Sequence, residues 1–136
     1  MNLLTRVADL MSTDLVTVTI HTPVEEAARL LVEHGIHHLP VVSATGTLEG
    51  IISQADFLKV SARPAPASTT VATIMTTGLA KLEPDDTVRT AAHLFALNRF
   101  HALPVVEGAK LRGILTTLDL VKFIDREETQ LADYRR

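Results

Sequence analysis

The sequence predicts an α+β fold made of two pseudo-symmetric halves that pack together through their sheets. The first observation is an internal repeat: residues 7–42 align with 71–106, and residues 48–60 align with 111–123. The second is that each copy has the pattern strand, helix, two-stranded hairpin, helix (βαββα). The third is size, because a copy of roughly 55 residues is marginal for a core of its own.

The first half of each copy predicts a strand followed by a helix. Residues 15–18 (LVTV) have the branched side chains typical of a strand. We expect the helix to begin at Thr22, with Pro23 in its first turn and Glu25 completing a capping box. Apolar residues follow at helical spacing, and Gly35 suits the left-handed residue that ends a helix.

The second half of each copy predicts a hairpin and another helix. Residues 38–42 (HLPVV) and 48–53 (LEGIIS) are expected to pair around a turn, and residues 54–60 (QADFLKV) to open a helix. The second copy repeats these elements, with Asp86 as the expected cap of its first helix. The predicted domains are repeat 1 at 7–60, a Pro- and Ala-rich linker at 61–70, repeat 2 at 71–124 and a charged tail at 125–136.

The composition excludes several classes of function. Of the 136 residues, 46% are apolar and 21% charged, as in an ordinary globular protein. A net charge of −3 argues against nucleic-acid binding, and the absence of cysteine excludes disulfides and thiolate chemistry. The N-terminal stretch lacks the apolar core of a signal peptide, and no run approaches membrane-spanning length. We therefore expect a cytoplasmic protein that does not interact with a membrane.

These motifs resemble a known family. Met11 followed by LVTV, HHLPVV and GIISQAD resembles a CBS domain, and Met75 with HALPVV and GILTTLD resembles a second one. The resemblance covers roughly residues 7–124 and implies a stand-alone CBS pair, often called a Bateman module. It further implies a homodimer, adenosine-containing ligands in clefts between the repeats, and regulation of a partner protein.

The segments GIISQAD and GILTTLD have two interpretations. Ser53 with Asp56, and Thr116 with Asp119, suit the start of a helix, where a hydroxyl caps and an acid favours the helix dipole. A capping box, however, prefers the longer Glu or Gln at its fourth position. The same geometry suits a ligand, because a helix N-terminus binds phosphate. In similar CBS pairs the Asp holds ribose and the hydroxyl lies near phosphate.

The resemblance implies two candidate clefts, each completed by the other repeat. One combines three residues of repeat 1 with three of repeat 2: Ile51, Ser53, Asp56, Ala80, Phe100 and His101. The other is its counterpart: Ile114, Thr116, Asp119, Val16, Ile36 and His37. Similar proteins often carry Arg at the positions of His37 and His101. Histidine is a weaker cation whose charge depends on pH, which disfavours strong triphosphate binding. The candidate ligands are AMP, ADP and ATP.

Other functions are less well supported by the sequence. His34, His37 and His38 have the spacing of metal ligands on a helix, but Gly35 is expected to break that helix. A hydrolase built on Ser53 and Asp56 lacks a histidine placed between them and an oxyanion loop. We therefore expect neither a metal site nor an enzyme. Two alternatives stay open: a scaffold without a ligand, and a sensor of S-adenosylmethionine or NAD.

Overall fold

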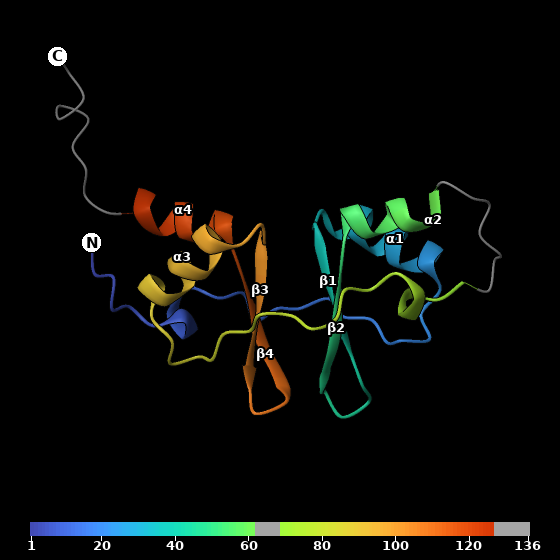
Figure 1. Ribbon diagram of the computed structural model, residues 1–136, viewed down its shortest axis with the longest axis horizontal. Coiled ribbons are helices and arrows are strands. Elements are labelled where there is room, and N and C mark those ends of the chain that lie inside the picture. The colour runs from blue at the N-terminus through green and yellow to red at the C-terminus, as the bar shows by residue number, and fades with distance from the viewer. Residues whose placement is uncertain (62–68, 127–136) are drawn as a thin grey trace, which may run out of the picture.

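Two antiparallel hairpins stand side by side at the centre of the molecule, with helices on their outer sides (Figure 1). The computed structural model describes residues 1–61 and 69–126. The α+β class and the two-repeat architecture are confirmed. Most of the expected linker and nearly all of the expected C-terminal tail lie outside the described residues. Within the described part of the chain, no helix is long and apolar enough to cross a bilayer.

Each repeat contributes one hairpin and two helical segments in the expected order. In repeat 1 these are α1 (Val24–His34), β1 (His38–Val42), β2 (Leu48–Ser53), the 3-10 turn η2 (Gln54–Phe57) and α2 (Leu58–Ser61). In repeat 2 they are α3 (Val88–Leu97), β3 (Ala102–Glu107), β4 (Lys110–Thr116) and α4 (Thr117–Asp125). A short 3-10 turn opens each repeat: η1 (Val7–Asp9) and η3 (Val71–Thr73).

The alternation of side chains along the strands explains how the halves share a core. Leu39 pairs with Ile52, and Leu103 with Leu115; all four face the helices of their own repeat and are fully buried. Their neighbours along the strands point the other way and meet between the hairpins: Ile51, Ala102 and Ile114. The two sheets therefore pack against each other through this third cluster.

The opening segments of the two repeats are exchanged between the halves. Val7 of η1 is fully buried in the core of repeat 2, and its N–H donates to the Asp86 carbonyl at 2.7 Å. Val71 of η3 is fully buried in the core of repeat 1. After these turns the crossing chains bridge to the second strand of each hairpin, Ser12 to Ile114 and Thr76 to Ile51. The halves are therefore interlocked.

Glycine is required where each crossing chain passes over a strand. A Cβ on Gly113 would lie 2.6 Å from the Met11 sulfur and 2.8 Å from the Ser12 carbonyl oxygen. On Gly50 it would lie 2.9 Å from both the Met75 sulfur and the Thr76 carbonyl oxygen. The Gly-Ile dipeptide of each repeat thus permits the close approach of the exchanged segment.

Residues 15–18 do not form the strand that their composition predicts. Only Val18 pairs with β1, where its N–H donates to the Pro40 carbonyl at 3.0 Å and its carbonyl accepts from Val42 at 2.9 Å. The physical reason is that this segment crosses from one hairpin to the other. Ser12 bridges β4, Val18 bridges β1, and the residues between them span the gap.

The predicted caps of the first helices are each wrong by one residue. Thr22 Oγ1 accepts from the Thr19 N–H at 3.1 Å, so it closes the preceding turn, and the cap position falls to Pro23. The Asp86 carboxylate likewise accepts from the Glu83 N–H at 2.7 Å, and Thr87 caps α3. The end of α1 is as expected, because Gly35 is left-handed with φ 62°.

Candidate ligand site

The hydroxyl and carboxylate of each GIISQAD-type segment close the start of a helical turn. The Ser53 N–H donates to the Asp56 carboxylate at 2.8 Å, and the Thr116 N–H donates to the Asp119 carboxylate at the same distance. The Thr116 hydroxyl in turn accepts from the Asp119 N–H at 3.1 Å. The argument that Asp is too short for a capping box is therefore wrong, and these contacts by themselves do not point to a ligand.

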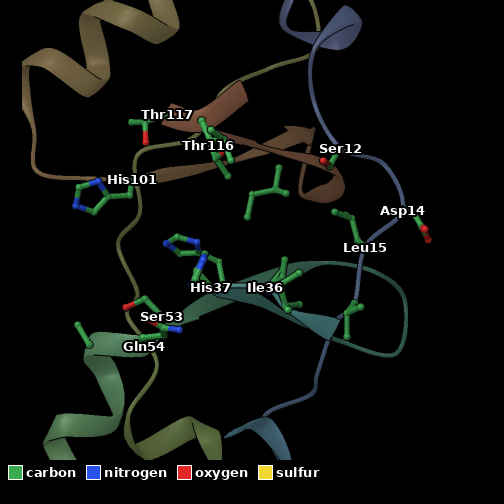
Figure 2. A pocket seen from close by; sticks show the side chains of 17 residues that line it. Ser12, Asp14, Leu15, Ile36, His37, Ser53, Gln54, His101, Thr116 and Thr117 are labelled. Atoms are coloured by element: carbon green, nitrogen blue, oxygen red, sulfur yellow. The ribbon is translucent and has the colours of Figure 1, made fainter. Parts of the chain in front are cut away.

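A pocket of about 590 Å³ opens between the two repeats beside Thr116. Figure 2 shows side chains from both hairpins and from the crossing segment pointing into it. Its apolar lining comes from the crossing segment, the end of α1 and the hairpins: Leu15, Val16, Ile36, Pro40 and Ile114. This size lies within the range of sites for small organic ligands, and the mixture of apolar walls with few polar groups is typical of them.

Three histidines contribute to the pocket, two from repeat 1 and one from repeat 2: His37, His38 and His101. Burial lowers the pKa of His38, and the neighbouring His37 and His101 lower it further, while Asp56 opposes the shift. Asp14 is the acidic residue in the lining. His38 therefore adds positive charge to the pocket only at a lower pH than an ordinary imidazole would.

The structure brings together most of the second predicted cleft. Five of its members line the pocket: Val16, Ile36, His37, Ile114 and Thr116. The sixth, Asp119, follows the lining residues Thr116, Thr117 and Leu118 in the first turn of α4, where its carboxylate is bound to the Thr116 N–H.

The residues of the first predicted cleft do not all lie around one pocket. Ser53 and His101 line the same pocket as the second cleft. Ile51 is buried between the hairpins, while Ala80 and Phe100 pack against the core of repeat 2. These three side chains are not among those that line the pocket.

Asp56 is the one buried charged residue of the described core, with 5% of its surface exposed. Its Oδ1 accepts from Thr76 Oγ1 at 3.0 Å and pairs with Lys59 Nζ at 2.9 Å, and its Oδ2 accepts from the Ser53 N–H. Burial alone raises its pKa, but the bonds from Lys59, Ser53 and Thr76 outweigh burial and hold the pKa of Asp56 below its ordinary value of 3.8.

Several lining residues were not anticipated from the sequence. They are Ser12, Asp14, Leu15, His38, Gln54 and Thr117, together with Gly35, Pro40, Ala55 and Leu118. A signal existed for Gln54 and Thr117, since each directly follows a capping hydroxyl. None existed for Ser12 and Asp14, because the exchange of the N-terminal segment cannot be deduced from local periodicity.

The histidines do not form a metal site in the described part of the chain. His34 ends α1, and the left-handed Gly35 turns the chain before His37. Across residues 1–61 and 69–126, no three or more His, Cys, Asp or Glu side chains are grouped closely enough to hold a metal ion.

Comparison with known proteins identifies the family to which the chain belongs. The family model described as CBS domain matches the chain twice, at residues 7–63 and 71–126. The chain therefore belongs to the CBS-domain family, and its fold is a tandem pair of such domains.

Two solved structures and one curated relative illustrate the similarity. CBSX2 in complex with AMP is 30% identical, with a TM-score of 0.82 over 92% of this chain and 99% of that one. The CBS pair of protein MJ0100, in complex with 5-methylthioadenosine and S-adenosyl-L-methionine, is 29% identical, with a TM-score of 0.83 over the same shares. Homoserine O-acetyltransferase of Methanosalsum zhilinae is 35% identical over 119 residues, which are 87% of this chain and 24% of that enzyme. The chain thus spans about a quarter of the length of such relatives.

Proposed function

We propose that this protein is a regulatory module that binds an adenine nucleotide between its two repeats and passes the bound state to a partner protein. The observation that carries the proposal is the pocket of about 590 Å³, which joins the N-terminus of α4 to apolar walls supplied by the other repeat. The complexes of similar CBS pairs with AMP and with S-adenosyl-L-methionine support an adenosyl ligand.

The pocket offers a distinct place for each part of such a ligand. Leu15, Val16 and Ile36 provide a flat apolar wall that suits an adenine ring. Thr116 stands at the start of α4, where the positive end of the helix dipole favours an anionic or polar group, although the N–H groups of Thr116 and Asp119 already have partners. In the proposed pose the Asp119 carboxylate accepts hydrogen bonds from ribose hydroxyls, with the phosphate directed toward His37 and His101.

The sign of the pH dependence distinguishes a phosphate ligand from a sulfonium ligand. The imidazole of His38 gains charge as the pH falls, at a lower pH than usual because burial lowers its pKa, and this charge attracts phosphate and repels the sulfonium of S-adenosylmethionine. We expect AMP to gain affinity relative to S-adenosylmethionine between about pH 8 and about pH 5.5. Titration calorimetry at both pH values measures the two trends.

Signalling requires two states that the ligand binds unequally. Because Ser12 is bonded to β4 and the same segment lines the pocket, a ligand that draws the walls together rotates one repeat against the other. The proposal includes a cytoplasmic location and a homodimer. The homodimer is supported by three apolar side chains of α4 that are each more than half exposed: Leu118, Val121 and Ile124. It includes no catalytic step.

Thermal unfolding with a panel of ligands tests this proposal. AMP, ADP, ATP, S-adenosylmethionine and NADH are compared, and a ligand present at a hundred times its Kd stabilises the fold by about 2.7 kcal/mol. Thr116→Val should abolish the ligand-induced shift. Thr87→Val is the matched control, because Thr87 also caps a helix but does not line the pocket. If no ligand stabilises the protein, a scaffold function replaces the sensor.

A further inference from the structure

We infer that the two repeats have diverged in role: Asp56 is a structural clamp closed by Thr76 and Lys59, and the chain takes one adenosyl ligand, on the Asp119 side. The number of ligands rests on the proposed function, whereas the clamp rests on geometry alone. Position 56 and position 119 are counterparts in the repeat, so the inference concerns a difference that the repeated motif does not reveal.

Both oxygens of the Asp56 carboxylate already have partners. Oδ1 accepts from Thr76 Oγ1 at 3.0 Å and is paired with Lys59 Nζ at 2.9 Å. Oδ2 accepts from the backbone N–H of Ser53 at 2.8 Å, and the Ser53 hydroxyl lies 3.3 Å away. A ribose at this carboxylate would have to displace an ammonium and a hydroxyl from a group that is 5% exposed.

Lys59 extends the clamp to the exchanged segment. Its Nζ lies between the Asp56 carboxylate and the Ile74 carbonyl oxygen, to which it donates at 2.8 Å. Thr76, which bonds the same carboxylate, lies two residues further along that segment and pairs with Ile51 of β2. The network therefore fastens the chain that enters repeat 2 onto repeat 1.

Asp119 has only part of this network. Its Oδ2 accepts from the Thr116 N–H at 2.8 Å, and within the described residues no hydrogen bond or ion pair engages its Oδ1. Lys59 and its counterpart Lys122 are both exposed, but the described residues show an ion pair only between Lys59 and Asp56, and none between Lys122 and Asp119. One carboxylate oxygen thus remains for a ligand.

The counterpart of Thr76 is Ser12, and it is used differently. Ser12 keeps the backbone bridge to β4, but it lines the pocket, and no hydrogen bond joins it to Asp119 among the described residues. Figure 2 shows Ser12 and Thr116 on neighbouring walls of the pocket. The exchanged segment with Thr76 therefore covers Asp56, whereas the equivalent segment with Ser12 makes no such bond to Asp119 and lines the pocket instead.

The apolar lining comes mainly from the segments that face Asp119. All four counterparts pack against the core of their own repeat, but Val16 and Ile36 also line the pocket, whereas Ala80 and Phe100 do not. Ser53, Gln54 and Ala55 at the other helix start line the pocket too. The hydrogen bonds of the two carboxylates therefore decide which half holds the ligand.

Titration calorimetry with AMP and with S-adenosylmethionine tests the number of sites. We expect one ligand per chain, and we expect Asp119→Asn to weaken binding about tenfold or more, since a charged acceptor is lost. A stoichiometry of two, or an equal loss of affinity in Asp56→Asn and Asp119→Asn, would overturn the inference.

A measurement of stability tests the structural role of Asp56 independently of any ligand. If neither compound binds, the proposed function is wrong, but the clamp can still be tested. Lys59→Met and Lys122→Met are a matched pair at equivalent positions, as are Asp56→Asn and Asp119→Asn. We expect the midpoint of thermal unfolding to fall in the Lys59 and Asp56 variants. It should change by no more than about a third as much in the Lys122 and Asp119 variants, because of the two carboxylates only Asp56 is buried and paired with a lysine. Equal losses within each pair would contradict the clamp.

Discussion

Replacing Gly113 with alanine tests the interlocking of the two halves. The new methyl group would lie 2.6 Å from the Met11 sulfur and 2.8 Å from the Ser12 carbonyl oxygen. The sulfur can move with its side chain, but the carbonyl is held because Ser12 and Ile114 exchange backbone hydrogen bonds at 2.9 and 3.0 Å. The exchanged segment must therefore shift, and these bonds must lengthen.

The expected loss of stability for Gly113→Ala is about 2–4 kcal/mol. Overpacking costs about 1–3 kcal/mol, and weakening one or two backbone hydrogen bonds adds about 0.5–1.5 kcal/mol each. The reduced entropy of the unfolded chain offsets about 0.4–1 kcal/mol. For a chain of this size the midpoint of thermal unfolding should fall by about 10 °C.

Urea denaturation followed by circular dichroism measures the effect. Gly50→Ala is the matched control and should cost less, because both of its closest contacts are at 2.9 Å. Adding Met11→Ala to Gly113→Ala should restore only part of the stability, since the Ser12 carbonyl still obstructs the methyl group. A loss below about 0.5 kcal/mol for Gly113→Ala would refute the reasoning.

Three further predictions concern caps and titrating groups. Thr87→Ala should destabilise the fold by about 1 kcal/mol through the lost bond to the Thr90 N–H, whereas Thr22→Ala should cost less, which urea denaturation can compare. Because the pKa of His38 is lowered in the folded state, its contribution to stability is present above pH 6.5 and is lost as the pH falls through the folded pKa. His38→Asn should therefore flatten this part of the plot of unfolding free energy against pH. Because the pKa of Asp56 is also lowered, its contribution is present above pH 3.8 and is lost on further acidification, and Asp56→Asn should remove this loss. A profile unchanged by either variant would contradict the corresponding assignment.

The repeated elements were predictable because their signals are local. Strand alternation places Leu39 and Ile52 on one face and Ile51 on the other, and this pattern is visible in the sequence. Gly35 ends α1 as expected, since few other residues adopt a left-handed conformation easily. The family resemblance rested on the same local features and is confirmed by the family match.

The exchanged segments were not predictable, because they depend on contacts between distant parts of the chain. Val7 has the same sequence environment as Val71, and nothing local indicates that each packs into the other repeat. The caps of α1 and α3 shifted because Thr22 and Asp86 bond to the preceding turn instead. The hydrophobic periodicity of the sequence does not indicate which of two competing backbone N–H groups such a side chain will bind.

Only some of the residues around the pocket were predictable from the sequence. Val16, Ile36, His37, Ile114 and Thr116 lie around one pocket as the resemblance implied. The two clefts are not equivalent, however, because Thr76 lies twenty residues beyond Asp56 and closes over its carboxylate. A repeated motif can therefore have two different surroundings when the segment that covers it differs.

Mapping a bound adenosyl ligand by NMR tests the central claim most directly. Titration of ¹⁵N-labelled protein with AMP, and separately with S-adenosylmethionine, follows every backbone amide. The claim predicts that at least one compound shifts the amides of residues 12–16, 36–38 and 116–119, with little change at the start of α1. Shifts confined to surfaces away from the pocket, or no shifts at millimolar concentrations of either compound, would contradict an adenosyl site between the repeats.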